Sequence, residues 1–151
     1  MPGVTPPRAR SSVEDPYDLA RFVRAQEQRY PQVLAELAQG AKRSHWMWFV
    51  FPQLQGLGSS PTAVTYAITS LAEARAYLAH PLLGMRLREC TQCLLALSGR
   101  TAHDIFGYPD DLKFRSCMTL FAHADPEGPW RVALERYFAG AEDLRTRELL
   151  I

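Results

Sequence analysis

The sequence predicts an all-α protein that forms one compact domain of about seven helices. Apolar residues recur at helical spacing along most of the chain, and no stretch shows the sustained apolar–polar alternation of a half-buried strand. No hairpin turn is flanked by two β-rich segments. Glycine, proline and capping residues interrupt the periodic stretches where short helices would begin and end.

The first helices are delimited by their end signals. Asp15 is expected to be the N-cap and Pro16 the first residue of a helix that is interrupted at Tyr30, because a residue before proline disfavours the α conformation. Pro31 then begins a second helix, which Gly40 ends. Residues 1–14 hold few large apolar groups and are expected to be a disordered or loosely attached tail, so the domain spans residues 15–151.

The middle of the chain contains one segment whose structure is ambiguous. Residues 46–51 are rich in aromatics and form either a short buried strand or one helical turn, because periodicity cannot decide over so few positions. Ser60 and Pro61 open the next helix, and Ser70 with Glu73 forms a capping box. A long helix with leucines on one face follows and ends before Gly99.

The last third repeats these signals. Thr101 to Asp104 is a capped start, and Asp110 or Asp111 is expected to cap a helix through residue 121. Pro129 begins a further helix, and residues 143–150 form a last one. Three cysteines are an odd number, which argues against a disulfide scaffold, and the C-x-x-C of residues 90–93 lies inside a helix, where packing is the expected role.

Composition limits the possible functions. The chain has 151 residues, 47% of them hydrophobic, and a formal charge of +1, so no overall electrostatic attraction to nucleic acid or to an anionic membrane is expected. No apolar run approaches the roughly 18 residues that span a bilayer, and the N-terminus lacks the apolar region of a secretory signal. The expected location is therefore the cytoplasm, and the oligomeric state is left open.

The first candidate site is residues 42–53, where four aromatics and a methionine follow a polar, cationic start. Stacked aromatics beside cations suit a flat, anionic ligand. The alternative is a structural role. The two cations then complement the dipole at the C-terminus of the preceding helix, and the histidine is a hydrogen-bonded residue at the edge of the core. The candidate ligand-binding residues here are Lys42, Arg43, Ser44, Trp46, Trp48 and Gln53, and the candidate catalytic residue is His45.

The second candidate site is residues 108–116, where two adjacent carboxylates precede two cations. Asp110 or Asp111 would activate water or stabilise a developing cation, and Lys113 or Arg115 would hold a phosphate. The alternative is a helix cap with surface ion pairs. The histidines are scattered without metal-ligand spacing, and the sequence has no phosphate-binding or dinucleotide glycine motif, so neither a metal nor a cofactor is expected.

These blocks resemble a known family. Residues 15–19, 42–53 and 106–121, with shorter blocks between them, identify the chain as a member of domain-of-unknown-function family 1810, whose members often carry the label calpastatin-like. The resemblance implies a small, mainly helical domain of bacterial type, whereas a calpain inhibitor would be a disordered, repetitive chain.

The order of the motifs is also similar to the ADP-ribose-linked N-glycosidase family typified by the bacterial YbiA proteins. This similarity rests on the aromatic segment, Tyr66 and the late basic helix. It implies a stacking role for Trp46 or Trp48 and an acid–base role for Asp110 or Asp111. It further implies phosphate contacts from Lys42, Arg43 and Lys113.

Three functions follow from these observations. The first is a hydrolase of N-glycosidic bonds in a nucleotide or ADP-ribose-type substrate, which needs a carboxylate, a stacking ring and cations in one site. The second is a module that binds a nucleotide or a peptide without chemistry. The third is a protein-interaction domain that uses the aromatic segment as its interface. The first two require the two candidate sites to meet in space.

Overall fold

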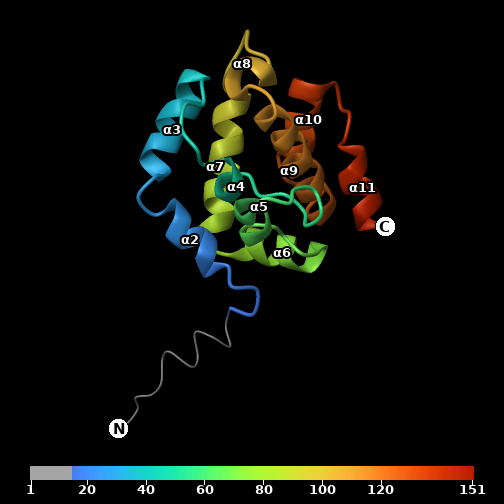
Figure 1. Ribbon diagram of the computed structural model, residues 1–151. Coiled ribbons are helices and arrows are strands. Elements are labelled where there is room, and N and C mark those ends of the chain that lie inside the picture. The colour runs from blue at the N-terminus through green and yellow to red at the C-terminus, as the bar shows by residue number, and fades with distance from the viewer. Residues whose placement is uncertain (1–14) are drawn as a thin grey trace.

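The computed structural model describes residues 15–151, and within them the fold is all-helical, as the sequence predicts. Helices α7 and α9 run through the middle of the molecule, with α2 and α3 on one side and α10 and α11 on the other (Figure 1). The predicted tail, residues 1–14, lies outside the described residues. The helices are α2 (Ala20–Gln26), α3 (Tyr30–Gln39), α4 (Met47–Val50), α5 (Pro61–Thr65), α6 (Leu71–Ala79), α7 (Leu83–Leu95), α8 (Ala102–Phe106), α9 (Asp110–Ala124), α10 (Trp130–Phe138) and α11 (Leu144–Leu150).

The described residues form ten helices rather than about seven. Three of them, α4, α5 and α8, are four or five residues long, and such single turns carry too few positions for a periodic pattern. The ambiguous aromatic segment is one of these turns, α4. After it the chain extends, and Leu54 forms an isolated parallel bridge with Ile68.

Helix α9 is the centre of the core, because it packs against α6, α8, α10 and α11. Phe114 on α9 is fully buried and lies within 6.1 Å, between ring centroids, of four other aromatic rings. Those rings come from segments far apart in the sequence: Phe51, Phe106, Tyr137 and Phe138. The aromatic core therefore fixes the start of α9 against the chain that follows α4.

Most predicted helix ends are confirmed. Gly40 ends α3 with a φ of 69°, a left-handed conformation that glycine adopts without steric cost. Thr101 and Asp104 form a complete capping box, and Asp143 caps α11 through Thr146. At Ser70 only half of the predicted box is present, because Glu73 accepts hydrogen bonds from Thr69 instead.

Two predicted caps are wrong. Asp110 and Asp111 lie inside the first turn of α9, which begins without a side-chain cap, because Asp110 is held by two lysines instead. Asp15 does bond the backbone N–H groups of Leu19 and Ala20, but α2 itself begins only at Ala20.

The cysteines behave as packing residues. Cys90 and Cys117 are buried and Cys93 is partly buried, and all three are free. Burial raises the pKa of Cys90 to about 12 and also raises the pKa of Cys117, so neither thiol forms the reactive thiolate at neutral pH.

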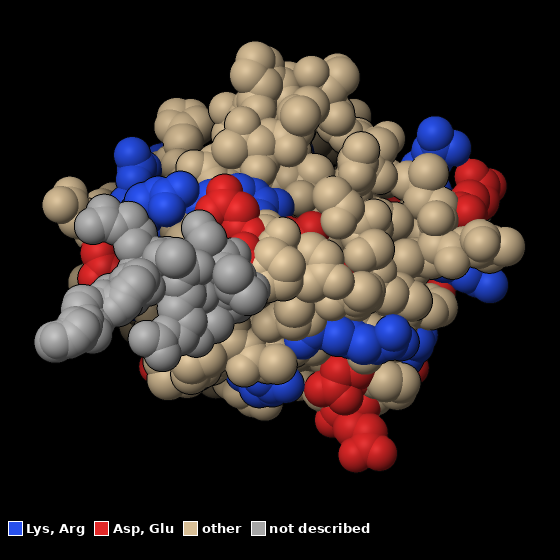
Figure 2. Space-filling view, turned by 90° about the horizontal axis from the view of Figure 1, so that it is seen from below, with Lys and Arg blue, Asp and Glu red and all other residues tan. Residues whose placement is uncertain are grey.

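No helix among residues 15–151 is both long and apolar enough to cross a membrane. On the face of the molecule seen in Figure 2, basic and acidic side chains form small separate groups with uncharged residues between them.

The start of α7 depends on a glycine. A Cβ atom on buried Gly84 would lie 2.1 Å from the carbonyl oxygen of Leu78, in the backbone at the end of α6. We expect Gly84→Ala to lower the free energy of unfolding by about 2 kcal/mol, because the clash outweighs the gain of about 1 kcal/mol in helix propensity. Urea denaturation measures this loss, and Gln92→Ala, at an exposed position of the same helix, is the control. A Gly84→Ala protein as stable as the wild type would show that the two helices separate without cost.

Candidate functional site

The segment before α4 is organised by one buried carboxylate, Glu36 of α3. Its two oxygens accept five hydrogen bonds at distances between 2.7 and 3.3 Å. The donors are the backbone N–H groups of Arg43 and Ser44, the Ser44 hydroxyl, the Trp46 indole N–H and the Gln32 amide. Burial alone would raise the pKa of Glu36, but these donors outweigh it and lower the pKa to about 2. Glu36 therefore stays ionised and holds the segment in one conformation.

The two candidate sites meet at an ion-pair cluster. Lys42 Nζ lies 2.8 Å from Asp110 Oδ2, and Lys113 Nζ lies 3.1 Å from Asp110 Oδ1. The Lys42 side chain is only 8% exposed. Burial would raise the pKa of Asp110, but hydrogen bonds and charge from the two lysines outweigh it and lower the pKa. Asp110 is therefore an ionised, doubly paired carboxylate that joins the start of α9 to the chain before α4.

A cleft of about 400 Å³ opens beside this cluster. Trp48 forms one wall, and the ammonium of Lys113 lies 4.1 Å from the centre of its ring, a cation–π distance. The other wall comes from the first turns of α9 and the chain that connects α10 to α11. The lining residues are Trp48, Gln53, Leu57, Pro109, Leu112, Lys113, Ser116, Asp143 and Arg145.

Gln53 is the polar side chain in this cleft that the fold leaves without a partner. The residue is 8% exposed, and no hydrogen bond joins its amide to another described residue, so the amide is in contact with solvent. Its backbone is fixed, because its carbonyl accepts from the N–H of Ile68 at 2.8 Å. An amide that lines a cleft from a fixed backbone has both a donor and an acceptor available for a ligand.

Comparison with known proteins is consistent with this fold. Residues 16–150 match the family described as "Protein of unknown function (DUF1810)". The chain belongs to this family. A solved structure described as the conserved hypothetical protein Rv1873 from Mycobacterium tuberculosis is similar, with 57% identity and a TM-score of 0.89 over 90% of this chain and 98% of that one. The comparison with curated proteins gave no match.

In this DUF1810 chain, several predicted site residues lie away from the cleft. His45 and Arg43 are exposed, and among the described residues their hydrogen bonds are made by the backbone: the His45 carbonyl accepts from Arg29, and the Arg43 N–H donates to Glu36. Asp111 bonds the N–H of Leu112 next to it and lies 3.7 Å from His103.

Aromatic packing and a second pocket account for three more predicted residues. Trp46 is in the core, 1% exposed, with its N–H on Glu36. Tyr66 packs against Phe22 and Phe49. Arg115 lines a different pocket from the cleft beside Trp48.

Sequence reasoning missed the residues that give the site its shape. Glu36 has no signal of its own, because a glutamate on an amphipathic helix normally indicates a solvated face. Asp143 and Arg145 lie about thirty residues from α9's first turn in the sequence, and only packing of α11 brings them to the cleft. No spacing motif links them to Trp48 or Gln53.

Proposed function

We propose that this protein binds a small, nucleotide-like molecule in the cleft beside Trp48, without a chemical step. The observation that carries the proposal is the Gln53 side chain, which is largely buried, lines the cleft and has no hydrogen-bond partner among the described residues. Solvent reaches this amide in the free protein, and a ligand that supplies one donor and one acceptor would replace the water there. The edge of a nucleobase or an amide has this pattern.

The rest of the lining suits the same ligand. Trp48, Leu57 and Leu112 supply apolar surface for a planar ring. Lys113 and Arg145 supply positive charge at the rim. The Arg145 guanidinium is more than half exposed and lies 3.7 Å from Glu148, so it is free to turn toward an anionic group.

The carboxylates favour binding over hydrolysis. Asp110 is paired with two lysines, and its lowered pKa makes it a poor proton donor at neutral pH. Asp143 lines the cleft but accepts hydrogen bonds from the backbone and hydroxyl of Thr146 at 2.9 and 2.6 Å. An N-glycosidase would need one of these groups released toward the substrate.

The interaction-domain hypothesis is less favoured for a different reason. An interface anchored by tryptophans needs both indoles at the surface. Trp46 is buried, and only Trp48 is partly exposed.

The test is ligand binding by the wild type and by two glutamine variants. We expect at least one nucleotide from a panel of nucleosides, nucleotides and NAD to bind in isothermal titration calorimetry. Gln53→Leu is expected to raise its Kd by about tenfold or more, because the leucine has the same size but makes no hydrogen bond. Gln55→Leu, two residues away and exposed, is expected to leave the Kd unchanged.

The outcomes separate binding without chemistry from hydrolysis. Binding lost in Gln53→Leu alone supports the proposal. Wild-type affinity in Gln53→Leu, or no binding across the panel, contradicts it. Chromatography of the same mixtures detects free base, and base release that depends on Asp110 would replace the proposal by the hydrolase.

A further inference from the structure

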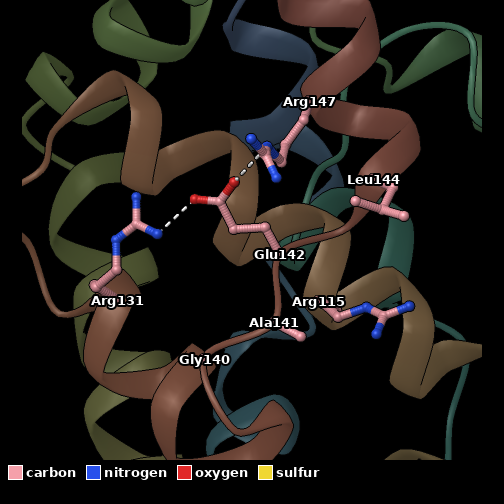
Figure 3. Close-up of a pocket in the computed structure, with 7 residues that line it drawn as sticks. All are labelled: Arg115, Arg131, Gly140, Ala141, Glu142, Leu144 and Arg147. Carbon is pink, nitrogen blue, oxygen red and sulfur yellow. Dashed lines mark hydrogen bonds and ion pairs between the residues drawn. The ribbon is translucent and has the colours of Figure 1, made fainter.

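A second pocket, of about 580 Å³, lies where α9, α10 and α11 meet, and it is rich in arginine (Figure 3). It is separate from the cleft beside Trp48, although the connection between α10 and α11 contributes residues to both. Its lining residues are Arg115, Arg131, Gly140, Ala141, Glu142, Leu144 and Arg147.

One carboxylate holds part of this charge in place. Glu142 accepts a hydrogen bond from Arg131 Nη1 and forms an ion pair with Arg147, whose Nε lies 3.2 Å from its carboxylate; His123 Nε2 also lies 3.2 Å away. Figure 3 shows Arg131 and Arg147 reaching Glu142 from two sides. Burial would raise the pKa of Glu142, but Arg131 and His123 outweigh it and lower the pKa. Three guanidiniums against one carboxylate leave the lining with an excess of positive charge.

Most guanidinium donors in this pocket have no acceptor among residues 15–151. Each arginine carries five N–H donors. Arg131 and Arg147 each use one of their nitrogens on Glu142. Arg115 uses none with a described residue, and it points away from Glu142 in Figure 3.

Arg115 also has a buried donor that solvent does not reach. Its Nε atom is buried and lacks a hydrogen-bond partner. The guanidinium lies over the Phe138 ring, 5.7 Å from the ring centre, so the ring covers one face of the guanidinium. The Nη groups, which make no hydrogen bond with a described residue, are the donors that Arg115 keeps for an acceptor in the open pocket.

We propose that this pocket binds the phosphate group of a small molecule, with Arg115 as its principal contact and Arg131 and Arg147 contributing their remaining donors. Phosphate matches the pocket because its tetrahedral oxygens accept from several forked guanidiniums at once. A dianion also balances the excess positive charge of the lining. The proposal does not depend on the cleft beside Trp48, because neither Gln53 nor Trp48 lines this pocket.

The experiment is an NMR titration of the full chain with inorganic phosphate, pyrophosphate, AMP and adenosine at constant ionic strength, read from the arginine side-chain Nε–Hε signals. We expect the Arg115 signal to shift saturably with pyrophosphate or AMP and to remain unchanged with adenosine. Phosphate and pyrophosphate test the free anion, and AMP tests the same group on a nucleotide. A response to the inorganic anions alone would assign the pocket to free phosphate.

Two variants with matched charge changes complete the test. Arg115→Met keeps the length of the side chain but removes its donors, and we expect it to raise the Kd by about tenfold or more. Arg24→Met removes the same charge from an exposed position on α2 and is expected to leave the Kd within about twofold. Arg147→Met gives an independent loss of affinity if Arg115→Met does not fold.

Three results would overturn the proposal. They are the absence of a saturable shift with any phosphate compound, equal weakening in Arg24→Met and Arg115→Met, and unchanged affinity in both Arg115→Met and Arg147→Met. Because Gln53→Leu leaves this pocket intact, its effect on adenosine binding reports on the cleft and not on this site.

Discussion

Replacing Arg21 by methionine is expected to lower the free energy of unfolding by about 3–5 kcal/mol, because it leaves a buried carboxylate without its cationic partner and several carbonyls without their donor. Arg21 donates to the carboxylate of Glu73 at 3.0 Å, and that carboxylate is only 2% exposed. It also donates at 2.6–2.8 Å to four backbone carbonyls, those of Tyr17, Asp18, Thr65 and Ala67. One guanidinium thus ties the start of α2 to the chain between α5 and α6.

Urea denaturation measures this loss in the free energy of unfolding, and a second arginine-to-methionine variant serves as the control. Arg24→Met on the same helix, at an exposed position, is expected to change stability by about 0.5 kcal/mol or less. The double variant Arg21→Met with Glu73→Met is expected to recover only part of the loss, since it removes the unpaired charge but leaves the carbonyls, and the two Thr69 donors of Glu73, without these partners. If Arg21→Met costs no more than Arg24→Met, the ion pair does not hold these segments together.

The helical fold follows from local signals that act over a few residues. Gly40, the Thr101–Asp104 box and Asp143 each satisfy backbone groups at a helix end, and neighbouring sequence alone specifies such bonds. The single turn α4 has too few positions for the helical repeat of apolar residues to be recognised in the sequence. Asp110 does not cap the helix, because Lys42 from a distant segment and Lys113 from the same helix offer it charge, where capping offers only N–H groups.

The candidate site could be predicted in its parts but not in its arrangement. Aromatic and cationic residues in 42–53 and 108–116 indicate where polar and flat groups collect, and the Lys42–Asp110 pair confirms that the two segments meet. Which indole faces the cleft depends on Glu36, one helix earlier in the chain. Its bond to Trp46 turns that ring inward and leaves Trp48 on the cleft wall.

Glu36→Ala is the second change with a large expected effect. It removes the acceptor of five donors around a side chain that is 6% exposed, and we expect a loss of about 3–4 kcal/mol in the free energy of unfolding. Exposed Glu27→Ala is the control and should change stability by about 0.5 kcal/mol or less. Because the donors hold the chain from Lys42 to Trp46, the same variant should weaken ligand binding in the cleft, even where the protein remains folded.

The pH dependence of stability tests the same carboxylate without removing it. The pKa of Glu36 falls from 4.5 to about 2 on folding, so its ionised form stabilises the protein above pH 4.5, and this contribution is lost as the pH falls toward 2. The shift corresponds to about 3 kcal/mol. In Glu36→Gln, which cannot ionise, urea denaturation should show lower stability at neutral pH and a shallower decline between pH 5 and 2. A decline as steep as in the wild type would mean that other acids govern acid unfolding and that Glu36 is not the charged centre of the segment before α4.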